Sequence, residues 1–183
     1  AAWHVARWSE TLTAEDLLRA HSPEYVARLT SEGLEEEILR AYELLHPDGT
    51  YHRYDPTRAQ LPLRELWGRI LERASGTLAG ARIARQTGFC FYFGGGMHHA
   101  HRDFGAGFCL VNDLVIALRR LQAEGRVRRA WVIDVDAHKG DGTAALTAED
   151  PTIATLSIHM AAGWPLDQPP LDAAGVPNPS FIP

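Results

Sequence analysis

The sequence predicts an α/β protein in which helices and strands alternate around a parallel sheet. Apolar residues in the first half recur with the period of a helix. The second half contains short apolar runs separated by a helical segment. Strands that are joined by a helix pair in parallel, so this half predicts the sheet. Polar residues that could carry chemistry directly follow two of the runs, at the sheet edge where α/β proteins bind ligands.

The first two helices have recognisable starts. Thr13 is a candidate N-cap for a short helix that includes Leu17 and Leu18. Ser22 and Pro23 start the second helix, because serine is a good cap and proline suits the first helical position. Two longer helices are predicted to follow, over residues 34–45 and about 63–87.

Three apolar runs predict buried strands, over residues 89–93, 130–136 and 152–158. An amphipathic helix over residues 110–121 lies between the first two runs. The tight Gly-rich segment 140–143 that follows the second strand is expected to be a loop. Strand, helix and strand in this order predict a βαβ unit.

The composition limits the class of protein. The chain has 183 residues, 45% of them hydrophobic, which suffices for one domain with a core. The net charge is -5 without a Lys/Arg stripe, so we expect no direct binding of nucleic acid. No apolar run is long enough to cross a membrane, and no signal-peptide pattern is present. Cys90 and Cys109 form no disulfide framework, so we expect a cytoplasmic protein. The sequence predicts no particular oligomeric state.

The end of the 130–136 strand carries the first candidate site residues. Asp134, Asp136 and His138 recur at every second position, and alternation directs them to one side. A buried carboxylate needs a partner. One carboxylate and one imidazole suit zinc or a similar divalent ion, so Asp136 and His138 are candidate metal ligands. A structural hydrogen-bond network is the alternative explanation for such a pair.

A second group follows the 89–93 strand. Three glycines over 94–96 allow a sharp turn or a close backbone approach. Adjacent His98 and His99 cannot easily bind one metal from an extended backbone, so they suit two separate proton-handling roles. Each needs an acidic partner to fix its tautomer, and Asp134 and Asp141 are available for this.

Together these motifs resemble the zinc-dependent histone deacetylase family, in order and in spacing. The blocks that carry the resemblance are Gly95–Ala100, Gly107–Asp113, Asp134–Thr143 and Ser157–His159, with His21–Val26 as an earlier block. The resemblance implies the arginase/deacetylase fold, a three-layer arrangement with helices on both faces of a parallel sheet. Residues 1–183 would form the N-terminal part of one catalytic domain that is incomplete at its C-terminus. The motifs are more similar to class IV-like and bacterial relatives than to nuclear class I enzymes.

The resemblance also implies a role for each candidate residue. Asp136 and His138 correspond to two of three protein ligands to zinc. Residues that correspond to the family's catalytic histidines and their carboxylate partners are His98, His99, Asp134 and Asp141, with His99 as the general base. A structural monovalent cation, usually potassium, would be held by Asp134, Asp136, His138, Ser157 and Ile158. The substrate channel would include Gly107 and Phe108, with Asp55 as a loosely matched carboxylate at the rim.

The implied activity is a zinc-dependent hydrolase that removes acetyl or other acyl groups with metal-activated water. Acetylated lysine peptides or small acetylated amines would be its substrates. The sequence has no candidate for the third zinc ligand or for the family's oxyanion-binding tyrosine, so we expect residues 1–183 alone to bind zinc poorly and to be inactive. His101 is expected to be exposed, or else to line the rim.

Two alternatives remain. One is a non-catalytic deacetylase-like binding module. The other is an arginase-type dimanganese ureohydrolase, which needs an aspartate where this chain has Gly140.

Overall fold

The structure is a computed structural model that describes residue 5 and residues 7–167. The elements of the first half are helices: α1 (Ala14–Leu17), α2 (Pro23–Leu29), α3 (Leu34–Ala41), the 3₁₀ turn η1 (Leu63–Glu65) and α4 (Leu66–Thr87). The second half contains α5 (Asp113–Ala123), β1 (Ala130–Asp134), α6 (Asp141–Thr147) and β2 (Ile153–Ser157). Within the described ranges, no helix is both long and apolar enough to cross a membrane.

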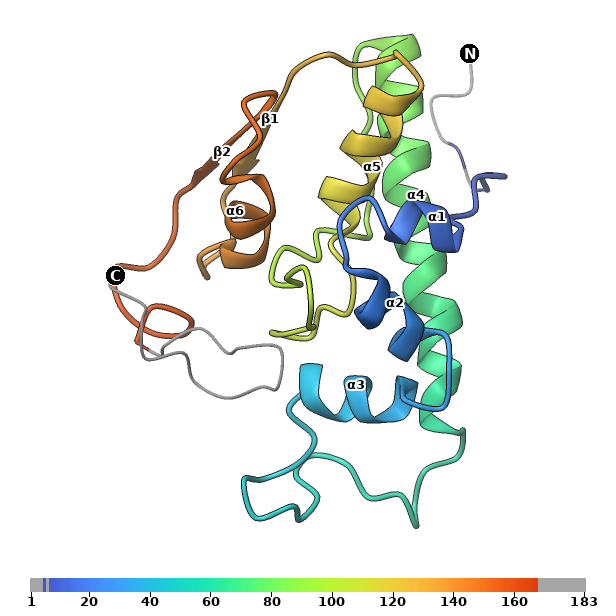
Figure 1. Ribbon diagram of the computed structural model, residues 1–183, viewed down its shortest axis with the longest axis vertical. Coiled ribbons are helices and arrows are strands. Elements are labelled where there is room, and N and C mark those ends of the chain that lie inside the picture. The colour runs from blue at the N-terminus through green and yellow to red at the C-terminus, as the bar shows by residue number, and fades with distance from the viewer. Residues whose placement is uncertain (1–4, 6, 168–183) are drawn as a thin grey trace.

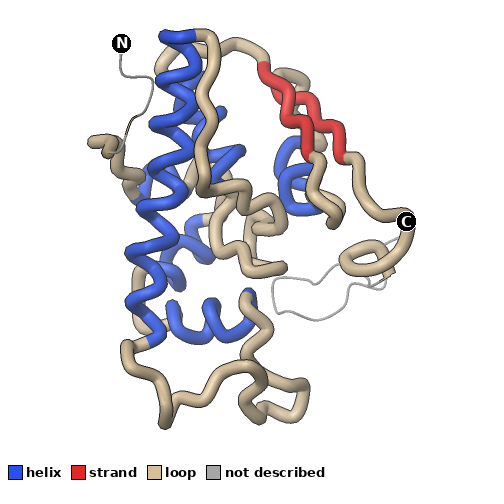
Figure 2. Tube along the Cα trace, turned by 180° about the vertical axis from the view of Figure 1, so that it is seen from behind, coloured by secondary structure: helices blue, strands red, loops and turns tan. Residues whose placement is uncertain are grey.

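The helices α1 to α5 pack together on one side, and β1, α6 and β2 form a separate unit beside them (Figure 1). The two strands are parallel, with Ala130 opposite Ile153 and Asp134 opposite Ser157. The parallel pairing predicted for the strands of the second half is therefore confirmed for β1 and β2. The βαβ unit itself differs from the predicted one, because α6 joins its two strands in place of the helix expected over 110–121. Helix α6 lies on the side of the strands that faces the other helices (Figure 2).

The predicted starts of the first two helices are also confirmed. The Thr13 side chain accepts a hydrogen bond from the Asp16 amide, and the Asp16 carboxylate accepts one from the Thr13 amide. This reciprocal pair is a capping box. Ser22 caps α2, and Pro23 occupies its first position.

The hydrophobic core lies among the helices rather than under the sheet. Its largest fully buried apolar side chains are Tyr25, Leu17, Leu29, Ile38, Leu110, Ile116, Leu121, Val111 and Val115. Within the described residues, the outer face of the strands is uncovered, and Trp131 and Ile133 are exposed. The structure thus has helices and a small parallel sheet, and it does not extend to the expected three layers.

The prediction of a buried strand over 89–93 is wrong for this structure. The segment is a loop that runs back along α4 (Figure 2). Its side chains nevertheless alternate between two sides, as they would in a strand. The Tyr92 hydroxyl donates to the Arg73 carbonyl oxygen of α4, whereas Phe89, Phe91 and Phe93 are 74%, 67% and 95% exposed. A strand needs a neighbour for its backbone N–H and C=O groups, and among the described residues β1 pairs with β2 alone.

Other predicted boundaries were wrong by a few residues for local reasons. Helix α5 starts at Asp113 rather than at residue 110, because the Asn112 side chain caps it by accepting the Val115 amide at 3.1 Å. Strand β1 ends at Asp134, where Oδ1 of that residue accepts the Asp136 amide at 3.0 Å. The expected loop over 140–143 is in fact mostly the first turn of α6.

Candidate metal and proton-transfer site

One buried carboxylate holds the glycine-rich loop that precedes the tandem histidines. Asp113 accepts hydrogen bonds from the amides of Gly96, at 3.0 Å, and Met97, at 2.7 Å, and from the Thr77 hydroxyl of α4. Burial raises the pKa of the Asp113 carboxyl, and these three donors oppose that effect. Gly96 has φ 74°, a conformation that glycine adopts readily. The loop is therefore fixed to α4 and α5 directly before His98.

The tandem histidines lie against each other, and each faces a carboxylate. Their ring centroids are 3.9 Å apart, and both side chains are buried. Nδ1 of His98 lies 2.5 Å from Oδ2 of Asp134, and Nδ1 of His99 lies 2.6 Å from Oδ1 of Asp141. A carboxylate accepts the Nδ1–H, so the Nε2 atom of each ring is left to handle protons.

Helix α6 brings Asp141 to this place. The Thr143 amide donates to the His98 carbonyl oxygen at 2.9 Å, which ties the start of α6 to the histidine segment. Any Cβ at position 142 would lie 2.6 Å from the His99 carbonyl carbon, so only glycine permits this approach. A Cβ on Gly140 would likewise collide with the Asp134 carboxylate and lie 3.3 Å from Nδ1 of His98.

The candidate metal ligands lie beside the histidines. Oδ1 of Asp136 accepts the His138 amide at 2.8 Å and lies 3.2 Å from Nδ1 of that residue. Nε2 of His98 is 3.9 Å from the same oxygen. The hydrogen bond from the His138 amide is the main reason that the pKa of the Asp136 carboxyl is lowered.

These two residues fit zinc in kind and in proximity, since they offer one carboxylate oxygen and one imidazole nitrogen. Their side chains are half-exposed, at 51% and 46%, and so remain open to a ligand. They do not fit zinc in number. Within residue 5 and residues 7–167, no group of three or more His, Cys, Asp and Glu side chains could hold a metal ion.

The residues expected at the potassium site lie around the ends of the two strands. Asp134 and Ser157 are paired in register, and the Ile158 amide donates to the Asp134 carbonyl oxygen at 2.9 Å. The Ser157 hydroxyl accepts the Gly140 amide at 3.3 Å. Binding of potassium here stays a prediction.

Of the expected channel residues, Gly107 lies at the histidine pair, and Phe108 follows it in the chain. Any Cβ on Gly107 would collide with the rings of His99 and Trp164. The Phe108 ring is half-exposed and packs edge-on against Tyr42 at 5.8 Å. The Trp164 ring lies 4.5 Å from the His99 ring. Sequence reasoning missed Trp164, because no motif distinguishes it from the other four tryptophans.

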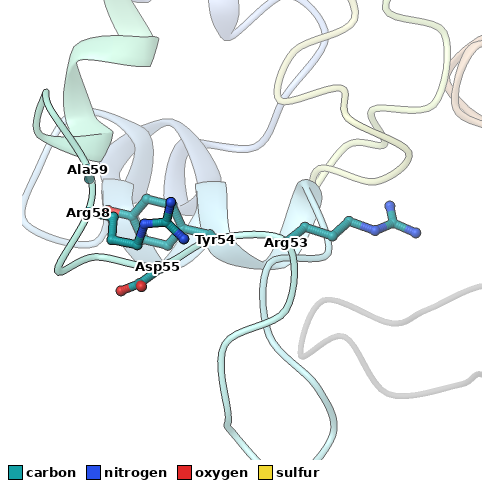
Figure 3. Close-up of a pocket in the computed structure, with 5 residues that line it drawn as sticks. All are labelled: Arg53, Tyr54, Asp55, Arg58 and Ala59. Atoms are coloured by element: carbon teal, nitrogen blue, oxygen red, sulfur yellow. The ribbon is translucent and has the colours of Figure 1, made fainter.

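Asp55 lies elsewhere. Its Oδ1 atom accepts hydrogen bonds from the Thr57 amide and hydroxyl, at 2.9 and 2.6 Å, within its own loop. The loop forms an open hollow whose lining residues are Arg53, Tyr54, Asp55, Arg58 and Ala59 (Figure 3). None of the expected zinc or proton-transfer residues lines this hollow. The role of Asp55 as a rim carboxylate therefore stays a prediction without support from the fold.

His101 is a site neighbour whose expected exposure was wrong. Its side chain is 14% exposed, and Nε2 lies 3.2 Å from Oδ2 of Asp141. Burial alone would raise the pKa of the Asp141 carboxyl, but the hydrogen bonds of His101 and His99 outweigh it and hold that pKa well below its usual range. The Asp141 carboxylate thus stays ionised between two imidazoles.

Histidines and carboxylates thus gather at the carboxyl ends of two parallel strands. This arrangement places the chain in the class of α/β proteins that bind their ligands at that edge of the sheet. The family model of the histone deacetylase domain matches residues 4–175. The chain belongs to this family, of whose domain it forms the N-terminal portion.

Individual relatives match shorter stretches. An uncharacterized protein of Picosynechococcus is 41% identical over 97 residues, which is 53% of this chain and 32% of that protein. Histone deacetylase HDAC1 of Drosophila melanogaster is 29% identical over 149 residues, or 80% of this chain and 27% of that protein. The acetoin utilization protein AcuC of Bacillus subtilis is 42% identical over 66 residues, 36% and 17% of the two chains. The matches therefore span at most about a third of these relatives.

Proposed function

We propose that the protein is a zinc-dependent hydrolase that removes acetyl groups from lysine side chains or related acetylated amines. The observation that carries this proposal is the arrangement of two carboxylate-paired histidines beside an aspartate–histidine pair. Nε2 of His98 lies 3.9 Å from Asp136, so the proton-handling rings and the candidate ligands face one place. Membership of the histone deacetylase family and the name of the Drosophila relative support the same chemistry.

Proton transfer is assigned to the tandem histidines. Asp141 accepts the Nδ1–H of His99, which leaves the Nε2 lone pair free to take a proton from the attacking water. Asp134 holds His98 in the same tautomer. Because both rings are buried, few competing waters surround them, and the proton taken by the pair can pass to the departing amine.

Asp136 and His138 are the residues that would hold zinc. When bound, zinc supplies a Lewis acid that polarises the acyl carbonyl and makes water acidic enough to be deprotonated near neutral pH. The glycine at position 140 argues against a dimanganese ureohydrolase, since any side chain there would disturb the pairing of Asp134 with His98. Residues 1–183 alone, with two ligands, are proposed to be inactive.

The substrate side chain is proposed to enter past Phe108 and Trp164. The Phe108 ring is half-exposed, and the Trp164 ring covers His99 on the side next to Gly107. Two aromatic walls suit the apolar methylene chain of an acyl-lysine or of an acylated polyamine. We further propose a cytoplasmic location.

The test is a substrate panel on the protein that the complete gene encodes. Acetyl-lysine peptides and acetylated polyamines are incubated with and without a chelator, and acetate release is measured. We expect acetate release from at least one class of substrate, loss of activity with the chelator and recovery with added zinc. Activity that resists the chelator would contradict the zinc mechanism.

A further inference from the structure

We infer that His101 is a positioning residue, a third histidine that fixes the Asp141 carboxylate and, through it, the His99 imidazole. The inference rests on the proposed function for the role of His99. The contacts that support it belong to the fold and can be tested without activity.

The His101 ring is held on two sides. Its Nε2 lies 3.2 Å from Oδ2 of Asp141, and its face stacks on Phe104 with centroids 4.5 Å apart and an interplanar angle of 15°. The His101 amide donates to the Phe104 carbonyl oxygen at 2.9 Å, which closes the loop beneath the stack. A ring that packs against a buried phenylalanine and faces a carboxylate has one orientation available to it.

The backbone of His101 is fixed as well. Buried His21 donates from Nδ1 to the His101 carbonyl oxygen at 2.8 Å, and its Nε2 accepts the Asn112 amide at 3.0 Å. The Ser22 amide donates to the carbonyl oxygen of the next residue, Arg102, at 2.9 Å. The junction of α1 and α2 therefore sets where the His101 side chain begins.

Asp141 consequently receives one imidazole on each carboxylate oxygen. His99 faces Oδ1 at 2.6 Å and His101 faces Oδ2 at 3.2 Å. A carboxylate held at one oxygen can turn about its last side-chain bond, because that torsion is broad. A carboxylate held at both oxygens cannot turn without losing a hydrogen bond. Because Oδ1 directs the His99 ring, His101 limits where Nε2 of His99 points.

The experiment uses three substitutions in the protein encoded by the complete gene. His101→Phe keeps an aromatic ring for the stack on Phe104 and removes the donor. His101→Gln places an amide nitrogen about as far from the backbone as Nε2, whereas His101→Asn reaches only as far as Nδ1. The readouts are kcat and KM on an acetyl-lysine peptide, melting temperature, and the ¹⁵N–¹H signal of the His99 Nδ1–H in histidine-labelled protein.

We expect His101→Phe and His101→Asn to lower kcat about tenfold, with KM within about twofold of wild type, as substitutions that disturb the orientation of a site residue do. Both should shift or broaden the His99 Nδ1–H signal, and His101→Gln should restore kcat and signal. A merely structural role predicts instead that His101→Phe, which preserves the stack, leaves both unchanged. That result, or a folded His101→Gln that behaves like His101→Asn, overturns the inference.

The experiment distinguishes failure of the proposed hydrolase function from failure of the positioning role of His101. If the wild-type protein releases no acetate, the proposed function fails, and the His99 signal alone decides the role of His101. If His101→Phe does not fold, the comparison of His101→Gln with His101→Asn decides it, because these two differ by one methylene group.

Discussion

At the scale of single residues, hydrogen-bond partners decide what each histidine can do. His98, His99 and His101 face carboxylates, which accept an N–H and favour a fixed tautomer. Buried His21 lies instead between a carbonyl oxygen and a backbone amide. It must donate from one nitrogen and accept at the other, which only the neutral ring can do. Burial lowers the pKa of His21 to about 4.

This pKa predicts how stability depends on pH. Above the unfolded pKa of 6.5, both states hold a neutral His21, and its contribution to stability is complete. As the pH falls from about 6.5 to about 4, the unfolded chain takes up a proton that the folded state excludes, so about 3 kcal/mol of stability is lost. Urea unfolding across this range should show a shallower pH dependence for His21→Gln than for wild type. Exposed His46→Gln is the control and should keep the wild-type slope; equal slopes for all three proteins would refute the prediction.

His99 gives the second prediction at this scale. His99→Gln removes the proposed base and should lower kcat by about 10² to 10⁴, the usual contribution of general-base catalysis. Zinc content should stay unchanged, because His99 is not a proposed ligand. Steady-state kinetics and elemental analysis on the complete gene product measure both, with His46→Gln as the matched control. A variant with wild-type kcat would exclude His99 as the base.

At the scale of elements, one side chain joins three segments around the site. Asn112 is fully buried. Its Oδ1 caps α5, and its Nδ2 donates to the Ala100 carbonyl oxygen at 3.3 Å and to the Thr143 hydroxyl of α6 at 3.0 Å. The histidine segment, α5 and α6 therefore share one amide.

Asn112→Ala should destabilise the fold by about 2–4 kcal/mol, since it removes a helix cap and leaves buried partners unsatisfied. Chemical denaturation gives this free energy of unfolding. Gln86→Ala, at an exposed amide in α4, is the control and should change it by less than about 0.5 kcal/mol. A similar small effect of Asn112→Ala would mean that the three segments are joined by other contacts.

What could be predicted from the sequence follows from the range of the interactions involved. The starts of α1 and α2 were predicted because a cap and its partner lie within three residues. The two histidine–carboxylate pairs span 36 and 42 residues. The need of each histidine for an acidic partner indicated Asp134 and Asp141 in advance, and the family resemblance indicated the same two residues. The contacts of His101 with Asp141 and of Trp164 with His99 were not predicted, because tertiary packing sets them. The 89–93 strand was predicted from alternation that the structure retains, although its pairing depends on a neighbouring strand.

At the scale of the whole molecule, a helical body with its own core lies beside a βαβ unit whose outer face is exposed. Trp131 and Ile133 of β1 and Leu156 of β2 contribute to this face. The expected larger sheet, with helices on both faces, stays a prediction. The helices expected on its second face would pack against this exposed face of β1 and β2. The candidate site lies at the edge where the unit meets the helical body, with two proposed zinc ligands on the βαβ side.

Two ligands should give weak metal binding. We expect calorimetric titration of residues 1–183 with zinc to give a Kd at least about 100-fold weaker than that of the complete gene product, since structural and catalytic zinc sites use three or four protein ligands. Asp136→Asn should weaken binding further in both proteins, and exposed Glu149→Gln should not. Tight one-to-one binding by residues 1–183 would contradict the expectation.

We propose that the loop after β1 and the tandem histidines form one metal-dependent site. Crystals of the complete gene product grown with zinc, measured on both sides of the zinc absorption edge, test it most directly. We expect an anomalous peak about 2.0–2.2 Å from a carboxylate oxygen of Asp136 and an imidazole nitrogen of His138, with His98 and His99 facing it. A zinc peak at other residues, or no peak between these two in a zinc-replete active protein, would contradict it.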